Sequence, residues 1–227
     1  MAGPLDQLAL QTDRSPALWA TVVPAIRQMI VTGALAPGEH LPEGELAKAL
    51  QMSRGPIREA LIELEREGLV VLRRHRGAQV ITLTAEDVEE IYTLRLSLER
   101  LAIERALPRL SAEHLAAMDE VLEQMRALGP DYAPQTALDL DLAFHGVLYD
   151  AAGHARLDRA WQQIRSQVAM FLHSRHVVRR DFHEIAYSEH QAIRDVLVGG
   201  DPAAASSVIE DHLMGSYHRL IEARPES

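Results

Sequence analysis

The amino-acid sequence predicts a mostly α-helical chain, in which an N-terminal winged helix-turn-helix precedes a C-terminal antiparallel bundle of six helices. Two observations predict this fold class. Between residues 18 and 83, helical patterns are followed by two short apolar stretches that flank a basic turn. From residue 84 onward, helical patterns alternate with turn residues and show no strand-like alternation. We therefore expect a tail at 1–17, a winged helix-turn-helix at 18–83 and a helical domain at 84–227.

The charge is divided unequally between the two expected domains. Residues 1–83 contribute nothing to the formal net charge of -10, because nine basic residues balance nine acidic ones. Residues 84–227 hold 14 basic and 24 acidic residues. Between Lys48 and Arg76, in contrast, seven basic residues stand against four acidic ones. The asymmetry favours two domains with different partners, of which only the N-terminal one suits a polyanion.

Composition also restricts the compartment and the kinds of site. The 227 residues include no cysteine, which excludes disulfides and thiolate metal sites. The first residues lack the basic and apolar segments of a signal peptide, and no apolar run approaches the length of a membrane span. We expect a cytoplasmic protein that has no contact with a membrane.

Two helices are expected before residue 51. The apolar stripe of the first consists of Leu18, Val22, Ile26, Met29 and Ile30. Pro24 must begin or kink this helix, and Gly33 closes it. After a turn at Pro37-Gly38, a short helix from Glu43 to Leu50 forms the first half of the helix-turn-helix.

The second helix of the helix-turn-helix is predicted to begin after Ser53, a favourable N-cap residue, and to end at Gly68. Its buried stripe consists of Ile57, Leu61 and Leu64. Arg54 and Arg58 lie near its start, where a recognition helix contacts bases. An arginine pair alone more often marks a solvated helix face, so the residues that follow decide between the two readings.

A basic turn between two short strands is predicted after this helix. Strands are expected at 69–72 and 79–83, and the turn between them consists of Arg73, Arg74, His75, Arg76 and Gly77. Residues 68–83 hold three arginines and no acid. Such a turn beside a helix start suits phosphate binding, so we interpret the unit as a winged helix-turn-helix that binds duplex DNA.

From about Trp19 to Leu83 the chain resembles the DNA-binding domain of the GntR family of bacterial transcriptional regulators. The matching residues are Gly33, Pro37-Gly38, Leu41, Glu45-Leu46-Ala47, Ser53-Arg54, Pro56-Ile57-Arg58-Glu59-Ala60-Leu61, Leu64, Glu67-Gly68-Leu69 and Gly77. The resemblance implies DNA contacts from Ser53, Arg54, Gly55, Arg58, Arg74, Arg76 and Gly77, the last of which would let the wing tip enter the minor groove. Many members carry a basic residue where this chain has Gly44, which leaves the operator sequence open.

Six helices are predicted after residue 84. They are expected at about 85–107, from Ser111 to before Gly129-Pro130, at 135–151, from 155 to the Arg179-Arg180 region, at 182–198 and from 202 to 222. Thr84 caps the first of them, and Pro108 stops it. Gly199-Gly200-Asp201-Pro202 ends the fifth helix and begins the sixth.

Four residues of this domain have the spacing of a metal site. Asp141 and His145 lie four residues apart on one face of the third helix. His190 and His212 are each eleven residues from residue 201, in the last turn, which places them at the same height in an antiparallel pair. Two such pairs on facing helices would form a four-ligand cage. In a chain with 11 histidines, the alternative is a coincidence in which these rings are hydrogen-bonded core residues.

Another helical pair, His173 and His176, is not assigned to this cage. Its neighbours Ser174 and Arg175 are polar, so we expect the pair on an exposed helix face.

The second domain resembles the effector-binding domain of the FadR-type branch of GntR regulators, known as the FCD domain. The matching elements are Asp141 to His145, Ser188-Glu189-His190 and Asp211-His212-Leu213, and the resemblance covers nearly all of 84–222. Six helices are closer to the shorter VanR-type group than to the seven-helix FadR type. Many FCD domains hold a divalent metal with one Asp and three His, so the resemblance implies that Asp141, His145, His190 and His212 are metal ligands.

Three imidazoles and a carboxylate suit Zn(II), with Ni(II) or Mn(II) as alternatives. An open coordination position could take the carboxylate of a small organic acid, with an arginine completing the contact. Arg95, near Tyr92 and Glu99, resembles the arginine often found near the metal in this domain. The alternative for Arg95 is an ion pair with Glu99 on the surface.

We therefore predict a ligand-responsive transcriptional repressor that binds a two-fold-symmetric operator and is released by a small carboxylate. A homodimer is expected, because one recognition helix reads too few base pairs for useful specificity. One alternative is a metal-dependent enzyme with a nucleic-acid-binding appendage, although the sequence shows no nucleophile elbow, P-loop or evident general base. The other is a structural DNA-binding protein whose metal stabilises a helical core and which has no effector.

Overall fold

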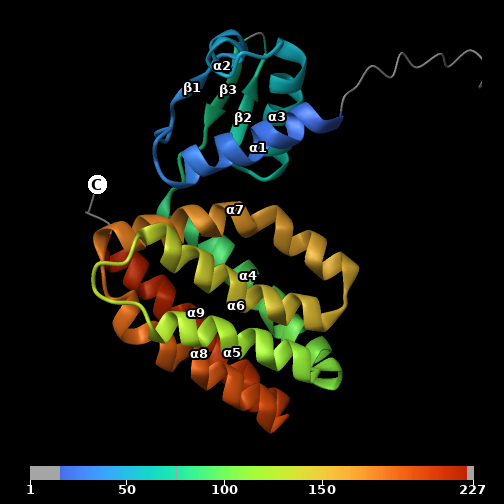
Figure 1. Cartoon of the computed structure of the whole chain (residues 1–227), viewed down its shortest axis with the longest axis vertical. Coiled ribbons are helices and arrows are strands. Elements are labelled where there is room, and N and C mark those ends of the chain that lie inside the picture. The colour runs from blue at the N-terminus through green and yellow to red at the C-terminus, as the bar shows by residue number, and fades with distance from the viewer. Residues whose placement is uncertain (1–15, 75, 224–227) are drawn as a thin grey trace, which may run out of the picture.

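A computed structural model describes residues 16–74 and 76–223, which form a small N-terminal domain stacked on an all-helical domain (Figure 1). Most of the predicted tail at 1–17 lies outside the described residues, as does His75 of the basic turn. The first helix begins at Pro16, two residues before the expected start of the N-terminal domain.

The N-terminal domain consists of three helices and a small antiparallel sheet. The helices are α1 (Pro16–Val31), α2 (Glu43–Ala49) and α3 (Arg54–Arg66), and the strands are β1 (His40–Leu41), β2 (Val70–Arg73) and β3 (Gly77–Val80). The strand order is β1-β3-β2. The winged helix-turn-helix is confirmed, but β1 was not predicted, because two residues are too few to show the alternation of a strand.

Apolar residues on one face of α3 form the centre of this domain. They are those of the predicted stripe, Ile57, Leu61 and Leu64. The expected stripe of α1 was wrong at Met29, which is 44 % exposed, whereas Val23 is buried. Pro24 lies inside α1 rather than at its start.

The C-terminal domain contains the six predicted helices and one short 3-10 turn. These are α4 (Ala85–Ala106), η1 (Leu107–Arg109), α5 (Ala112–Arg126), α6 (Pro134–Ala152), α7 (Ala155–Val178), α8 (Phe182–Gly199) and α9 (Pro202–Ala223). Capping boxes at Thr84 and Ser111 begin α4 and α5. Gly200 takes a left-handed conformation with φ of 73°, which ends α8 before Pro202. Pro108 falls inside η1, because α4 cannot continue through a residue that lacks an N–H.

Helix α4 contacts α6, α7 and α9, while α8 packs against α5 and α9 (Figure 1). The buried face of α4 therefore packs against α6 and α9, two of the helices that carry residues of the predicted cage. In the described parts of the chain, no helix combines the length and the apolar character that crossing a membrane requires.

Helix α7 forms the surface of the helical domain that faces the N-terminal domain (Figure 1). Glu67, at the end of α3, accepts a hydrogen bond from Arg27 Nε at 2.6 Å and another from Ser166 Oγ of α7 at 2.6 Å. Gln167 Nε2 donates to Gly68 O at 3.1 Å. The C-terminal end of α3 is therefore fixed to α7.

Candidate metal centre and DNA-binding surface

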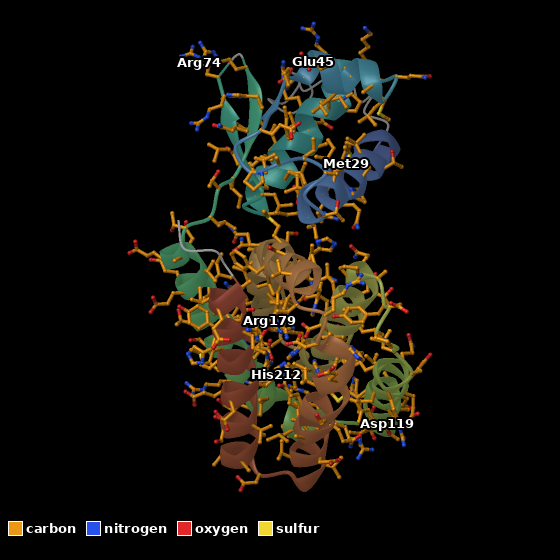
Figure 2. The ribbon with its side chains drawn as sticks, turned by 90° about the vertical axis from the view of Figure 1, so that its left-hand side faces the viewer. Met29, Glu45, Arg74, Asp119, Arg179 and His212 are labelled. Carbon is orange, nitrogen blue, oxygen red and sulfur yellow. The ribbon has the colours of Figure 1, made fainter. Side chains whose placement is uncertain are left out.

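Basic side chains from α3 and from the turn between β2 and β3 line one groove of about 610 Å³. The arginines in its wall are Arg54, Arg58, Arg73, Arg74 and Arg76. Figure 2 shows Arg74 at the tip of the wing, far from the helical domain. Gly77 lies in the same wall, whereas Ser53 and Gly55 are exposed at the start of α3 outside the groove. The structure thus brings together five of the seven residues expected to contact DNA, namely Arg54, Arg58, Arg74, Arg76 and Gly77.

Arg58 is held by the helix that precedes it. Its Nε and Nη2 donate to Glu43 Oε1 and Oε2 at 3.0 and 2.9 Å, and this contact lowers the pKa of Glu43. Arg54 lies close to Gly44, where an added Cβ would be 3.4 Å from the Arg54 Nη2. A contact between Arg58 and DNA therefore requires exchange of the Glu43 carboxylate for a base edge or phosphate.

Gly77 has a structural role that the sequence did not reveal. Its φ is 86°, and a Cβ at this position would lie 2.2 Å from the carbonyl oxygen of Leu41. Only glycine allows this approach of β1 to the beginning of β3. The role was missed because β1 itself was not predicted.

The four residues of the predicted cage meet inside the helical domain. Asp141 and His145 come from α6, His190 from α8 and His212 from α9, and one ligand atom from each lies within 4.8 Å of the others. All four residues are buried, and Figure 2 shows His212 in the middle of the helical domain. The ring centroids of His190 and His212 are 4.6 Å apart, as their equal distance from the α8–α9 turn leads one to expect.

Each histidine of the cluster is oriented through its Nδ1 atom. The His145 Nδ1 faces Glu99 Oε2 at 2.7 Å, and the His212 Nδ1 faces Glu189 Oε2 at 3.2 Å. The His190 Nδ1 lies 2.8 Å from the carbonyl oxygen of Ala186. Such contacts fix the tautomer of a metal-binding histidine and direct its Nε2 toward the ion. Sequence reasoning missed these three partners, although Glu189 precedes a predicted ligand.

The two Nε2 atoms of His145 and His212 lie 3.2 Å apart. Because the carboxylates beside these rings accept hydrogen bonds, both Nδ1 atoms donate, and a ring in its neutral form presents a lone pair at Nε2. Two facing lone pairs repel unless a proton or a metal cation lies between them. Burial lowers the pKa of His212 to about 4, so the His212 ring does not supply this proton at neutral pH. The donor set therefore fits a divalent cation.

The charge states of the carboxylates also fit a cation. Burial raises the pKa of Asp141, but the side chains of His190, His145 and Arg95 outweigh burial and hold this pKa well below its usual value. Against the effect of burial, His145 and Arg95 lower the pKa of Glu99 to about 2. Asp141 and Glu99 are therefore ionised at neutral pH, as a metal ligand and its supporting carboxylate must be.

Arg95 lies beside this cluster in the interior. Its side chain is 1 % exposed, and its Nε donates to Glu99 Oε1 at 2.7 Å. Its Nη2 is 3.8 Å from Asp141 Oδ2, and the guanidinium lies over the ring of Trp161. The pair with Glu99 that was considered as an alternative exists, but it is buried rather than on the surface.

A small cavity adjoins the cluster on the side of α8 and α9. Its wall includes Asp141, His190 and His212, together with Arg175 and Arg219, and the space open to the centre of a water molecule is about 10 Å³. That volume admits about one water molecule.

The expectation of an exposed face at His173 and His176 was wrong. Both side chains are buried, and the ring of His176 packs against Phe182 at 4.8 Å between centroids. The polar neighbours misled the prediction, since Arg175 is also buried and only Ser174 is exposed.

Two family models match the chain. Residues 18–80 match the model described as "Bacterial regulatory proteins, gntR family", and residues 90–215 match the FCD domain. Together these segments include the arginine groove and all four residues of the buried cluster.

Individual relatives agree with these matches. The Bacillus subtilis (strain 168) protein named "Uncharacterized HTH-type transcriptional regulator YdhC" is 33 % identical over 144 residues, which are 63 % of this chain and 64 % of that protein. The gluconate operon transcriptional repressor of the same organism is 32 % identical over 149 residues, which are 65 % of this chain and 60 % of the repressor. The matched part of the chain therefore spans less than two thirds of the length of these relatives.

Solved structures share the fold over a larger part of the chain. E. coli McbR/YncC has a TM-score of 0.77 at 20 % identity and covers 91 % of this chain and 98 % of its own. A GntR regulator from Rhodococcus sp. RHA1 has a TM-score of 0.66 at 24 % identity and covers 91 % of this chain and 99 % of its own. At these identities the likeness shows the fold alone.

Proposed function

Because the chain belongs to the GntR family of bacterial regulatory proteins and carries an FCD domain, we propose that it is a repressor whose operator is released when a small organic acid binds beside a divalent metal. As a member of this family it is a transcriptional regulator and not an enzyme. The proposed metal and effector site rests on one observation: the Nε2 atoms of His145 and His212 face each other in the FCD domain. The relative named as a gluconate operon repressor supports repression over activation.

The DNA contacts are proposed for the arginine groove. Arg54 and Arg58, at the start of α3, contact bases or phosphates in the major groove, with Ser53 and Gly55 beside them. Arg74 and Arg76 bind phosphates near the wing, and Gly77 gives the wing its entry to the minor groove. The charge of this groove and its distance from the acidic helical domain support the proposal.

The metal is proposed to bind Asp141, His145, His190 and His212. Three imidazole nitrogens and one carboxylate oxygen favour Zn(II), with Ni(II) or Mn(II) as alternatives. When bound, the ion supplies a Lewis-acidic position for an organic carboxylate. Glu99 and Glu189 hold the two facing rings in the orientation that this binding needs.

The effector is proposed to be a small carboxylate. Arg95 lies next to Asp141 and contributes positive charge to the ligand cluster. Effector binding acts on operator affinity only as far as the effector binds one conformation more tightly than the other. Helix α7 couples the effector site to the DNA-binding domain, since its Ser166 contacts Glu67 at the end of α3.

A cytoplasmic homodimer on a two-fold-symmetric operator completes the proposal. Helix α4 carries an apolar stripe at Leu94, Leu98 and Leu101, of which Leu94 is 46 % exposed. Residues at this spacing lie on one side of a helix and suit contact with the same helix of a second copy.

One observation favours the second candidate, a structural DNA-binding protein with a metal-stabilised core. The cavity beside the cluster admits about one water molecule, so an effector larger than this requires the wall to move. The two candidates differ in whether an organic acid changes operator affinity.

A thermal-shift screen of sugar acids and monocarboxylic and dicarboxylic acids, with and without a chelator, separates these candidates. The repressor proposal predicts that at least one acid raises the midpoint of unfolding of the metal-loaded protein and loses this effect when the metal is removed. Stabilisation by the metal alone, with no response to any acid, favours the structural protein. A protein that contains no metal and gains no stability from zinc, nickel or manganese contradicts both.

A further inference from the structure

Two arginines other than Arg95 line the cavity beside the ligand cluster, Arg175 and Arg219. Arg175 of α7 is 3 % exposed, and its side chain lines the cavity together with Asp141, His190 and His212. A buried guanidinium at the wall of such a cavity is a strong and directional binding group for an anion.

The hydrogen bonds of Arg175 are incomplete. Its Nη2 donates to Asp181 Oδ1 at 2.7 Å, but its buried Nε has no hydrogen-bond partner among residues 16–74 and 76–223. Nε and Nη2 form one edge of the guanidinium, which can hold both oxygens of a carboxylate. Asp181 uses half of this edge, so a better-placed carboxylate can replace it.

Asp181 is suited to leave. It lies between α7 and α8, and its side chain makes no capping hydrogen bond to α8. Its side chain is 27 % exposed, so it can be rehydrated when the contact breaks. Arg175 supplies the ion pair that Asp181 makes within the described part of the chain.

Arg219, the other arginine of the cavity, likewise has a buried Nε with no hydrogen-bond partner among the described residues, but its carboxylate partner is not free to leave. Arg219 Nη2 donates to Glu189 Oε2 at 2.9 Å, but the same oxygen also faces the His212 Nδ1 at 3.2 Å. Displacing Glu189 would therefore remove the hydrogen-bond partner that orients His212 in the metal cluster. Exchange at Arg175 has no such consequence.

We propose that Arg175 binds a second anionic group of the effector, that Asp181 occupies this position in the effector-free protein, and that the effector is a dicarboxylic acid. The proposal rests on the proposed function, because the first carboxylate of the effector is the one that binds beside the metal. One carboxylate meets the cluster of α6, α8 and α9, and the other replaces Asp181 on α7.

Displacement of Asp181 also makes room. A dicarboxylic acid exceeds the 10 Å³ open to water centres, so the segment between α7 and α8 must move outward when the acid enters. Arg175 is nine residues from Ser166 along α7, about 13 Å at helical rise. A movement of this end of α7 therefore reaches the contact between Ser166 and Glu67 at the recognition helix.

Calorimetric titration of the full-length, zinc-loaded protein tests the proposal with acetate, malonate, succinate and glutarate as probes. We expect at least one dicarboxylate to bind at least tenfold more tightly than acetate. Arg175→Gln should reduce this dicarboxylate to the affinity of acetate and leave acetate unchanged. Asp181→Asn, which keeps the arginine and removes its competitor, should bind the dicarboxylate several-fold more tightly than the wild type.

Arg179→Gln is the matched control, since Arg179 ends the same helix and pairs with Glu222 on the surface. It should bind every probe like the wild type, and zinc content verifies that each variant retains the cluster. Equal affinity for acetate and all dicarboxylates, or equal losses for both classes in Arg175→Gln, overturns the role of Arg175 while the proposed function stands. If Arg175→Gln does not fold, unchanged or weaker dicarboxylate binding by Asp181→Asn overturns it. The absence of binding by any probe overturns this inference and counts against the proposed effector, while metal content still tests the cluster.

Discussion

The Nε2 atoms of His145 and His212 lie 3.2 Å apart, while the Nδ1 atom of each ring faces a carboxylate. The carboxylates of Glu99 and Glu189 thereby determine where the proton of each ring lies. Both lone pairs point to the same place, with Asp141 and His190 beside them. The fold itself thus arranges four donors around one position before any ion contributes, which limits the reorganisation that metal binding requires.

Replacement of Glu99 by glutamine should weaken metal binding by roughly 10–100-fold. The amide can still accept from the His145 Nδ1, but it lacks the charge that makes this imidazole a better ligand, and it leaves the buried Arg95 without its partner. Competition with a coloured chelator measures the change. Glu104→Gln, an exposed position of the same helix, should retain wild-type affinity. Unchanged metal affinity in a folded Glu99→Gln protein would show that Glu99 does not support the site.

Arg58 and Arg76 should differ in what their removal does to DNA binding. Arg58→Ala should weaken operator binding by roughly 1–3 kcal/mol and reduce discrimination at one base position. Arg76→Ala should weaken binding to all sequences and reduce the salt slope by about 1. Fluorescence anisotropy with operator and scrambled duplexes over a range of salt concentrations separates the two effects. Arg66→Ala, at the far end of α3, is the control. If Arg58→Ala and Arg76→Ala both bind DNA with wild-type affinity, the DNA-binding surface lies elsewhere.

His176 should make the protein less stable in acid. Burial, with the charge of Arg175, lowers the pKa of His176 from 6.5 to about 4. The unfolded chain therefore binds a proton at higher pH than the folded protein. The contribution of His176 to the free energy of unfolding is complete above pH 6.5 and is lost as the pH falls toward 4. By linkage this loss is at most roughly 3 kcal/mol.

The variant His176→Phe isolates this contribution. It fits the aromatic surroundings formed by Phe182 and Tyr132 and cannot be protonated. Urea unfolding of both proteins between pH 7 and pH 4 should show a smaller fall in the free energy of unfolding for the variant. Parallel curves for the two proteins would mean that His176 titrates normally in the folded state.

The apolar stripe of α4 should mediate dimerisation. Leu94→Glu places a charge on this surface and should shift the protein toward a species of 25.2 kDa in sedimentation at micromolar concentration, with weaker operator binding. Leu94 is exposed in the single chain, so the variant should keep its helical content. The control Val198→Glu changes an exposed residue at the end of α8 and should remain dimeric. A monomeric wild type would exclude the dimer altogether.

The helices could be predicted from the sequence because local residues determine their ends. Thr84 and Ser111 cap their helices with their own side chains, and Gly200 ends α8 with a left-handed backbone. The strand β1 could not be predicted, since it exists only through pairing of His40 and Leu41 with residues almost forty positions later. The predicted burial of Met29 was wrong for a similar reason, because periodicity identifies the buried face of a helix but not how wide that face is.

The ligand cluster was also predictable in part. The spacing of Asp141 and His145 and the symmetry of His190 and His212 about a turn are local features. The supporting groups depend on contacts between helices, such as that of Glu99 on α4 with His145 on α6. The burial of His176 likewise depends on a contact with another element, that of its ring with Phe182 on α8, whereas its neighbours in the chain indicate exposure.

The central claim is that the metal cluster carries the signal for release of DNA. The most direct measurement is operator binding by wild-type protein and by His190→Ala as an organic acid that binds the wild type is added, with His218→Ala as the surface histidine control. The wild type and His218→Ala should release the operator when the acid is added. His190→Ala should bind the operator with nearly unchanged affinity and should not respond to the acid. Normal release from a metal-free His190→Ala protein would show that the metal cluster does not carry the signal.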